Sequence, residues 1–157
     1  MARIADYTVD HRGLDWPDLL ASWAWLVPRQ FTVWIMNRFG DLFLVFEDGS
    51  VHMLDVGRGS LERVADNRDD FANRVDEGTN ANEWLMIPLV DELRKAGVVP
   101  GPTECYSYVQ LPVLGGDYTR GNTRVVSIAH HYKAFGPIHE TIKDIPDGTV
   151  VKFDVAG

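Results

Sequence analysis

The sequence predicts an α+β fold, a single domain in which an antiparallel meander sheet packs against helices and a strand-helix-strand unit follows. Apolar residues recur with strand periodicity from residue 31 to residue 65, in four runs that turn residues separate. Helical patterns then occupy residues 67 to 97, and strand patterns return from residue 106. Because strands and helices are grouped along the chain rather than alternating, an α/β fold with a parallel sheet is disfavoured.

The composition is that of one globular domain covering residues 1–157, with 45% hydrophobic and 24% charged residues. The net charge of -8 disfavours a nucleic-acid partner, since phosphate binding depends on clustered Lys and Arg. Cys105 is the single cysteine, so no intrachain disulfide can form, which fits a reducing cytosol. The sequence shows neither a signal-peptide pattern nor an apolar run of about 20 residues, and we therefore expect a cytoplasmic protein without membrane contact.

The first 30 residues predict a lead-in followed by one helix. Residues 1–13 have no sustained periodicity and are expected to form a tail or a loosely packed lead-in. Asp15 can cap a helix, and Pro17 lies in its first turn, where the missing N–H costs nothing. The helical pattern ends at Pro28. Trp23 shares its helical spacing with leucines, which favours a packing face over a ligand groove.

Four strands are expected to form the meander. Residues 31–36 are apolar on both alternating faces, as in a central strand that is covered on both sides. Residues 42–46 predict the second strand, and Asp48-Gly49 provides a hairpin turn into residues 51–54. Residues 60–65 predict the fourth strand.

Two helices are predicted next. Asn67 is expected to cap the first helix, with the carboxylate of Asp70 near its positive end. Asn80 is expected to cap the second, which Gly97 ends. Pro88 lies inside the second helix and should kink or divide it, because proline removes a backbone hydrogen bond.

The stretch from Glu104 to Asn122 predicts a short aromatic strand, from about Tyr106 to Leu111, and a reversal of the chain. Pro112 cannot donate to a sheet ladder, so it should end the strand. Gly115-Gly116 can adopt the positive φ angles of a tight turn.

The C-terminal part predicts strand, helix and strand. Residues 125–133 alternate as a long strand that Gly136-Pro137 ends. Residues 138–145 are expected to form a short helix, and residues 149–155 a last strand.

The pattern contains no recognisable catalytic or metal-binding motif, and we predict no catalytic residue, no metal and no cofactor. His130 and His131 are adjacent in a predicted strand, so they should point to opposite faces and cannot chelate one ion together. His130 is expected in the core, and His139 on the surface near the start of a short helix. Cys105 lies beside Glu104, which opposes thiolate formation, and is expected to be buried and inert.

Acidic residues gather between Asp66 and Glu92, where eight acids stand against two bases. This segment indicates either a docking face for a basic protein or the solvated side of two surface helices. As candidate partner-binding residues we select Asp66, Asp69, Asp70, Asp76 and Glu77.

Several segments together resemble a known family. They are FGDLFLVFEDGSVHMLDVGRG, EWLMIPLV, ECYSYVQLPVLGGDYTRGN and GPIHETIKDIPDG. Over residues 15–150 the chain is similar to the C-terminal domain of immunity proteins against type VI secretion DNase effectors. The resemblance implies a non-catalytic antidote that binds a secreted nuclease, a basic protein toxin, and blocks it.

An alternative of another class stays open at this point. Aromatic side chains around the Gly115-Gly116 turn are a reasonable pocket wall for a small-molecule-binding protein or an enzyme. The residues that would line this cleft are Tyr106, Tyr108, Tyr118 and His139.

Overall fold

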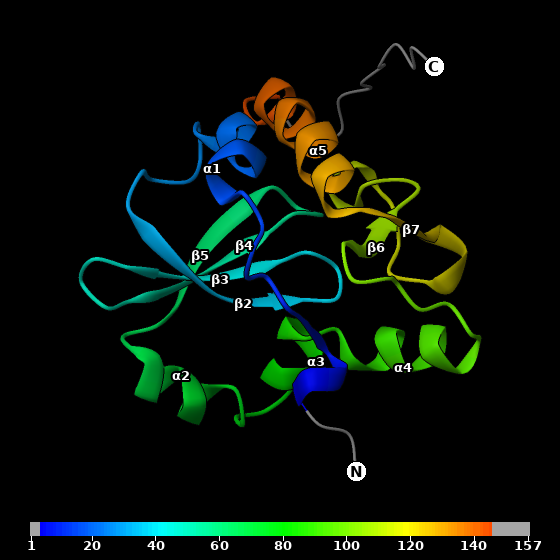
Figure 1. Ribbon diagram of the computed structural model, residues 1–157, viewed down its shortest axis with the longest axis horizontal. Coiled ribbons are helices and arrows are strands. Elements are labelled where there is room, and N and C mark those ends of the chain that lie inside the picture. The colour runs from blue at the N-terminus through cyan, green and yellow to red at the C-terminus, as the bar shows by residue number, and fades with distance from the viewer. Residues whose placement is uncertain (1–3, 146–157) are drawn as a thin grey trace.

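The computed structural model describes residues 4–145 and confirms the α+β fold (Figure 1). Its main sheet is an antiparallel meander in the order β1-β2-β3-β4-β5. The strands are β1 (Thr8–Val9), β2 (Phe31–Asn37), β3 (Leu42–Phe46), β4 (Val51–Asp55) and β5 (Ser60–Ala65). The four predicted strands are all present.

The lead-in contributes a fifth strand, which periodicity alone did not predict. Thr8 and Val9 pair with Asn37 and Met36 at the edge of the sheet. A 3-10 turn, η1 (Ile4–Asp6), precedes them. Tyr7 between the two elements is only 5% exposed. The described part of the lead-in is therefore integrated into the fold.

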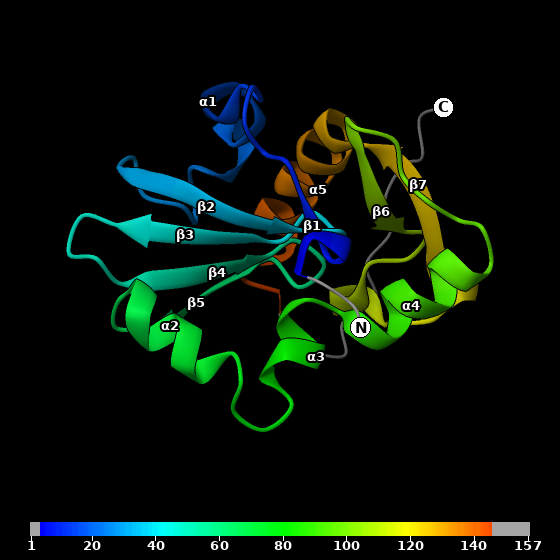
Figure 2. The same ribbon diagram turned by 60° about the horizontal axis from the view of Figure 1, so that its bottom comes forward.

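Helices cover both sides of the sheet (Figures 1 and 2). On one side lie α1 (Trp16–Leu19), the 3-10 turn η2 (Ala21–Trp23) and α5 (Ile128–Ile142). On the other side lie α2 (Arg68–Arg74), α3 (Asn80–Trp84) and α4 (Ile87–Lys95). An aromatic cluster fills the space between the sheet and α2 and α3, where Phe71 contacts Trp34, Phe43 and Trp84 at ring-centre distances of 5.1–5.3 Å. Such burial of aromatic surface is a main source of stability.

The predicted helix caps at Asp15 and Asn67 are confirmed. The Asp15 side chain accepts from the Asp18 N–H, and the Asn67 side chain accepts from the Asp70 N–H. The helix that begins after Asp15 is shorter than predicted, because it gives way to the 3-10 turn η2 after one turn.

The helix predicted from Asn80 is divided, as Pro88 suggested. The division falls at Met86, which has the left-handed φ of 52° and separates α3 from α4. Pro88 lies in the first turn of α4, where its missing N–H leaves no intrahelical bond unmade. The N-cap of α3 is Thr79 rather than Asn80, and its side chain makes no capping bond to the backbone.

A second, two-stranded sheet lies beside α4 and α5 (Figure 2). It pairs β6 (Glu104–Tyr108) with β7 (Thr123–Ser127). The 3-10 turns η3 (Pro112–Leu114) and η4 (Arg120–Asn122) form the reversal between them. The strand predicted to reach Leu111 therefore ends three residues earlier.

The long strand predicted over residues 125–133 is wrong beyond Ser127. The Ser127 side chain accepts from the His130 N–H and starts α5, which runs through Gly136-Pro137 to Ile142. The buried positions Ile128, Tyr132 and Phe135 also fit helical spacing, so the alternation was ambiguous over this short stretch. The last strand, predicted over residues 149–155, lies outside the described residues.

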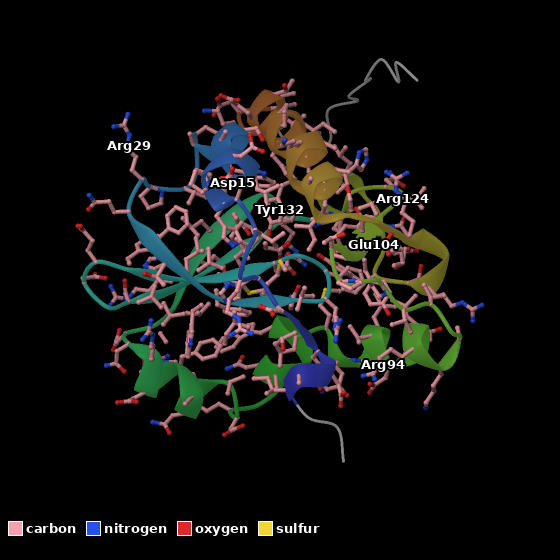
Figure 3. The ribbon with its side chains drawn as sticks, in the orientation of Figure 1. Asp15, Arg29, Arg94, Glu104, Arg124 and Tyr132 are labelled. Atoms are coloured by element: carbon pink, nitrogen blue, oxygen red, sulfur yellow. The ribbon has the colours of Figure 1, made fainter. Side chains whose placement is uncertain are left out.

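The turn at residues 37–41, between β2 and β3, is the centre of the packing. The Asn37 side-chain oxygen accepts from the N–H groups of Phe39 and Asp41, and its amide donates to the carboxylate of Asp41 and to the Trp84 carbonyl. The Tyr132 hydroxyl of α5 donates to the Gly40 carbonyl. Figure 3 shows Tyr132 between α5 and the sheet, where it is fully buried.

The same turn also holds the second sheet. The Tyr106 N–H of β6 donates to the Arg38 carbonyl at 2.8 Å. The Phe39 ring lies 5.2 Å from the ring of Tyr106 and 5.4 Å from that of Tyr108. The residues of this turn therefore connect the meander to α3, α5 and β6.

Gly136→Ala should destabilise the fold although alanine is the better helix former. A Cβ at Gly136 would meet the Ser22 carbonyl at 2.8 Å and Nε1 of Trp23 at 2.9 Å, so α5 and η2 would have to separate. We expect urea unfolding to show a loss of about 1–3 kcal/mol. Ala129→Gly, at an exposed position of α5, is the control for helix propensity and should cost about 1 kcal/mol or less. A Gly136→Ala variant as stable as the wild type would contradict this close packing.

Candidate functional site

A cleft of about 620 Å³ opens between the β4–β5 hairpin, helices α3 and α4, and the segment that contains Tyr108 and Tyr118. Its lining residues are Asp41, Met53, Asp55, Arg58, Ser60, Glu62, Asn82, Glu83, Trp84, Met86, Pro88, Leu89, Glu92, Tyr108 and Tyr118. They come from four separate parts of the chain. The cleft is therefore a product of the tertiary fold.

The charge of the cleft is strongly acidic. Five carboxylates line it against the single guanidinium of Arg58. Glu62 and Glu92 are exposed, and the carboxylate of neither has an ion pair or hydrogen bond within residues 4–145. The cleft thus offers acceptors without matching internal cations.

Asp41 lines this cleft with its carboxylate, although the residue is only 2% exposed to solvent. Its oxygens accept from the Asn37 amide and from the Val56 N–H, both at 2.9 Å. Burial, and secondly the charge of Asp55, raise the pKa of Asp41 well above 3.8. The folded state therefore disfavours a negative charge here unless a cation lies nearby.

Asp55 and Arg58 form the turn at one edge of the cleft. The Asp55 carboxylate accepts from the Arg58 N–H at 3.0 Å, and burial raises the pKa of Asp55. The Arg58 guanidinium turns instead to Tyr118, donating to its hydroxyl at 3.0 Å. The one basic side chain of the cleft is therefore engaged with an aromatic residue at the rim.

Aromatic and sulfur-containing side chains form the remaining wall. The Tyr108 hydroxyl, on a side chain only 1% exposed, contacts the Met86 sulfur at 3.7 Å, a weak acceptor. No stronger partner for this hydroxyl exists among residues 4–145. Met86, whose backbone is left-handed, and Trp84 both line the cleft. A strained residue kept at a cleft is a pointer to function.

The predicted cleft beside Gly115-Gly116 is displaced from its expected position. Tyr108 and Tyr118 do line the observed cleft, but Tyr106 and His139 are buried elsewhere. Gly115 has a φ of 94°, and a Cβ on Gly116 would collide with the Gln110 carbonyl. The two glycines are thus explained by chain reversal.

The five selected acids gather at α2 and its flanking turns, outside the cleft. Asp66 pairs with Arg63 at 3.1 Å, and Asp70 pairs with Arg74 at 2.8 Å. The exposed members whose side chains have no hydrogen bond or ion pair within residues 4–145 are Asp69, Asp76 and Glu77. The acidic segment is thus split, since Glu83 and Glu92 line the cleft instead.

Two predictions for histidines are wrong. His130 is exposed in the first turn of α5, whereas His131 is the buried histidine and shares a hydrogen bond of 2.9 Å with the Ser107 hydroxyl. Burial lowers the pKa of His131 to about 3, so it is neutral. His139 is 2% exposed and contacts the Val56 carbonyl at 2.6 Å from the second half of α5, not from the surface. The misplaced strand caused both errors.

Cys105 is buried, as expected. Burial raises the pKa of its thiol far above the usual range, and the charges of Asp41 and Glu104 act in the same direction. Within residues 4–145 no group of three or more His, Cys, Asp or Glu is placed to hold a metal ion. No helix in this range is long and apolar enough to cross a membrane.

A Ser, a His and an Asp do meet at the β3–β4 hairpin, but in an order unsuited to catalysis. Ser50 donates to Asp48 at 2.5 Å and lies 3.0 Å from Nε2 of His52. In a catalytic triad the acid orients the histidine, whereas here the carboxylate binds the serine itself. Ser50 is also fully buried, so this group stabilises the turn.

Fold and cleft together define an α+β domain with an acidic and aromatic cleft. Residues 65–139 match the family model described as T6SS immunity protein Tdi1, C-terminal, where T6SS is the type VI secretion system. The family expected from the sequence is thereby confirmed over this segment, which runs from the end of β5 into α5. Over these residues the chain is similar to the C-terminal part of a type VI secretion immunity protein. No curated protein matches the chain.

Asp55→Asn should raise the free energy of unfolding, more at about pH 8 than at about pH 4. Because burial raises the pKa of Asp55 above 3.8, its contribution to stability is complete below that pH and is lost as the pH rises through the folded-state pKa. Asparagine keeps an acceptor for the Arg58 N–H and removes the charge. Urea unfolding at several pH values measures the effect.

Asp48→Asn is the control, because the pKa of Asp48 is shifted in the opposite direction. Asp48 is exposed, and hydrogen bonds from Ser50 lower the pKa of its carboxyl. Its contribution is present above pH 3.8 and lost as the pH falls, so Asp48→Asn should destabilise the protein mainly at neutral pH. An Asp55→Asn variant without any pH-dependent gain would contradict the assigned electrostatics.

Proposed function

We propose that this protein neutralises a secreted nuclease effector in the cytoplasm by binding it directly, without catalysis of its own. The observation that carries the proposal is the match of residues 65–139 to an immunity-protein family. The net charge of -8 supports a nuclease as the partner. A nuclease must hold a phosphate backbone in a basic cleft, so an acidic inhibitor is attracted to that cleft.

We further propose the acidic surface of α2 and its flanking turns as a docking surface. It consists of Asp66, Asp69, Asp70, Asp76 and Glu77. Asp70 is engaged with Arg74 and with the Asp66 N–H, so it also serves the local fold. The carboxylates of Asp69, Asp76 and Glu77 are exposed and have no side-chain partner within the described residues, so they are the members that can act on a partner.

A small-molecule-binding protein remains the second candidate because one observation favours it. The acidic and aromatic cleft has a volume typical of ligand pockets. Its lining offers carboxylates, one serine and two tyrosines, but no cysteine or histidine. Binding is therefore better supported than a nucleophilic reaction.

The proposed function predicts that co-expression restores growth to cells that make the cognate effector in their cytoplasm, and that the purified proteins form a complex. The triple variant Asp69→Asn, Asp76→Asn, Glu77→Gln should slow association about tenfold at low salt, because steering depends on the facing charges. Surface plasmon resonance measures the rate.

The matched control changes the same number of charges on other surfaces. Glu47→Gln, Glu140→Gln and Asp144→Asn are all exposed positions outside α2. This control should associate nearly as fast as the wild type. Equal slowing by both triple variants would contradict a docking role for α2, and absence of a complex with the wild type would refute the proposed function.

A further inference from the structure

The cleft beside Trp84 and Tyr108 has a composition that the proposed docking face on α2 does not share. Its lining combines carboxylates with aromatic and thioether groups around one cavity of about 620 Å³. A cation that carries an apolar stem complements such a lining, because its head can meet the acids while its stem lies on the rings.

Two features of the cleft show polar groups that the fold itself does not fully compensate. The nearly buried Tyr108 hydroxyl has only the Met86 sulfur, at 3.7 Å, as its partner among the described residues. Asp41, which is 2% exposed, and the partly buried Asp55 bring two carboxylates to the cleft, and a buried negative charge is unfavourable unless hydrogen bonds or a cation compensate it. A bound cationic group would compensate the charge of the carboxylates and donate a hydrogen bond to the oxygen of the Tyr108 hydroxyl.

The rim of the cleft indicates where such a group would come from. Val113 is 46% exposed and Tyr118 is 40% exposed, so both present apolar surface to solvent. The backbone nitrogen of Val113 lies 3.4 Å from the carbonyl oxygen of Gly57. Gly57 lies between Asp55 and Arg58 in the sequence, and both of these residues line the cleft. The exposed Val113 is therefore next to the cleft. A free small cation would leave this rim uncovered, whereas a protein segment would cover it.

We infer that the cleft receives one arginine side chain of a protein partner, with the guanidinium among Asp55, Glu62, Glu83 and Glu92 and the flanking residues on Val113 and Tyr118. Arginine fits better than lysine, because its planar head stacks on aromatic rings and donates to two carboxylates at once. The inference rests on the proposed function only for the identity of the partner, the toxin.

The test needs no toxin. The full chain, labelled with 13C at the methionine methyl groups, is titrated with the peptide acetyl-Ala-Val-Arg-Val-Ala-amide and observed by NMR. Met53 and Met86 line the cleft and report binding, whereas Met36 is fully buried in the core and serves as an internal control. We expect saturable shifts of the Met53 and Met86 signals with little change at Met36.

Three comparisons make the result decisive. The same peptide with citrulline in place of arginine, which is neutral and nearly the same shape, should not produce the shifts. Glu62→Gln with Glu92→Gln should weaken the peptide about threefold to tenfold, the range of exposed ion pairs acting together. Glu47→Gln with Glu140→Gln, the matched control, should bind it like the wild type.

The inference would be overturned if the Met53 and Met86 signals did not move, or if the citrulline peptide moved them equally. Propylguanidinium, which carries the same single charge without flanking residues, should bind more weakly than the peptide, and tighter binding of propylguanidinium would refute a protein side chain as the occupant. These outcomes are separate from those of the toxin experiment. A toxin that fails to bind the wild type removes the proposed function and leaves the result for the cleft unchanged.

Discussion

The Asn37 side chain and the turn that it organises are the interaction on which the rest of the structure depends. Its amide makes hydrogen bonds within the turn and reaches the Trp84 carbonyl of α3. Asn37 is fully buried, so each of these bonds replaces water that the folded protein excludes. Loss of the amide would leave several buried groups without partners at once, which costs more than the loss of a single bond.

This turn also explains why a charged residue lies so deep in the protein. Asp41 links the turn to the Val56 N–H, and Val56 directly follows Asp55. The His139 ring of α5 contacts the Val56 carbonyl. The carboxylate is therefore held by core contacts while its surroundings open into the cleft. Structural stability and the chemistry of the cleft depend on the same few residues.

Local features could be predicted from the sequence, and features that join distant segments could not. The meander strands and the caps at Asp15 and Asn67 depend on neighbouring residues, so their patterns were sufficient. The strand predicted past Ser127 failed because a short apolar alternation also fits a helix face. The cleft was missed because Asp41, Asp55 and Tyr108 are remote in sequence. Of its lining, only Tyr108 and Tyr118 had been connected with a pocket.

The segment that matches the family model, residues 65–139, starts at the end of β5 and covers only part of the folded core. Residues 65–139 begin at the last residue of β5, so they contain β6 and β7 but none of the strands β1 to β4. The aromatic residues of α2 and α3 in this segment pack on Trp34 and Phe43, which precede it. The unit of sequence similarity is therefore smaller than the unit of cooperative folding. An exchange of residues 65–139 between relatives would replace only one side of the hydrophobic core. Whether the hybrid folds would then depend on how well the new α2 and α3 pack on the original sheet.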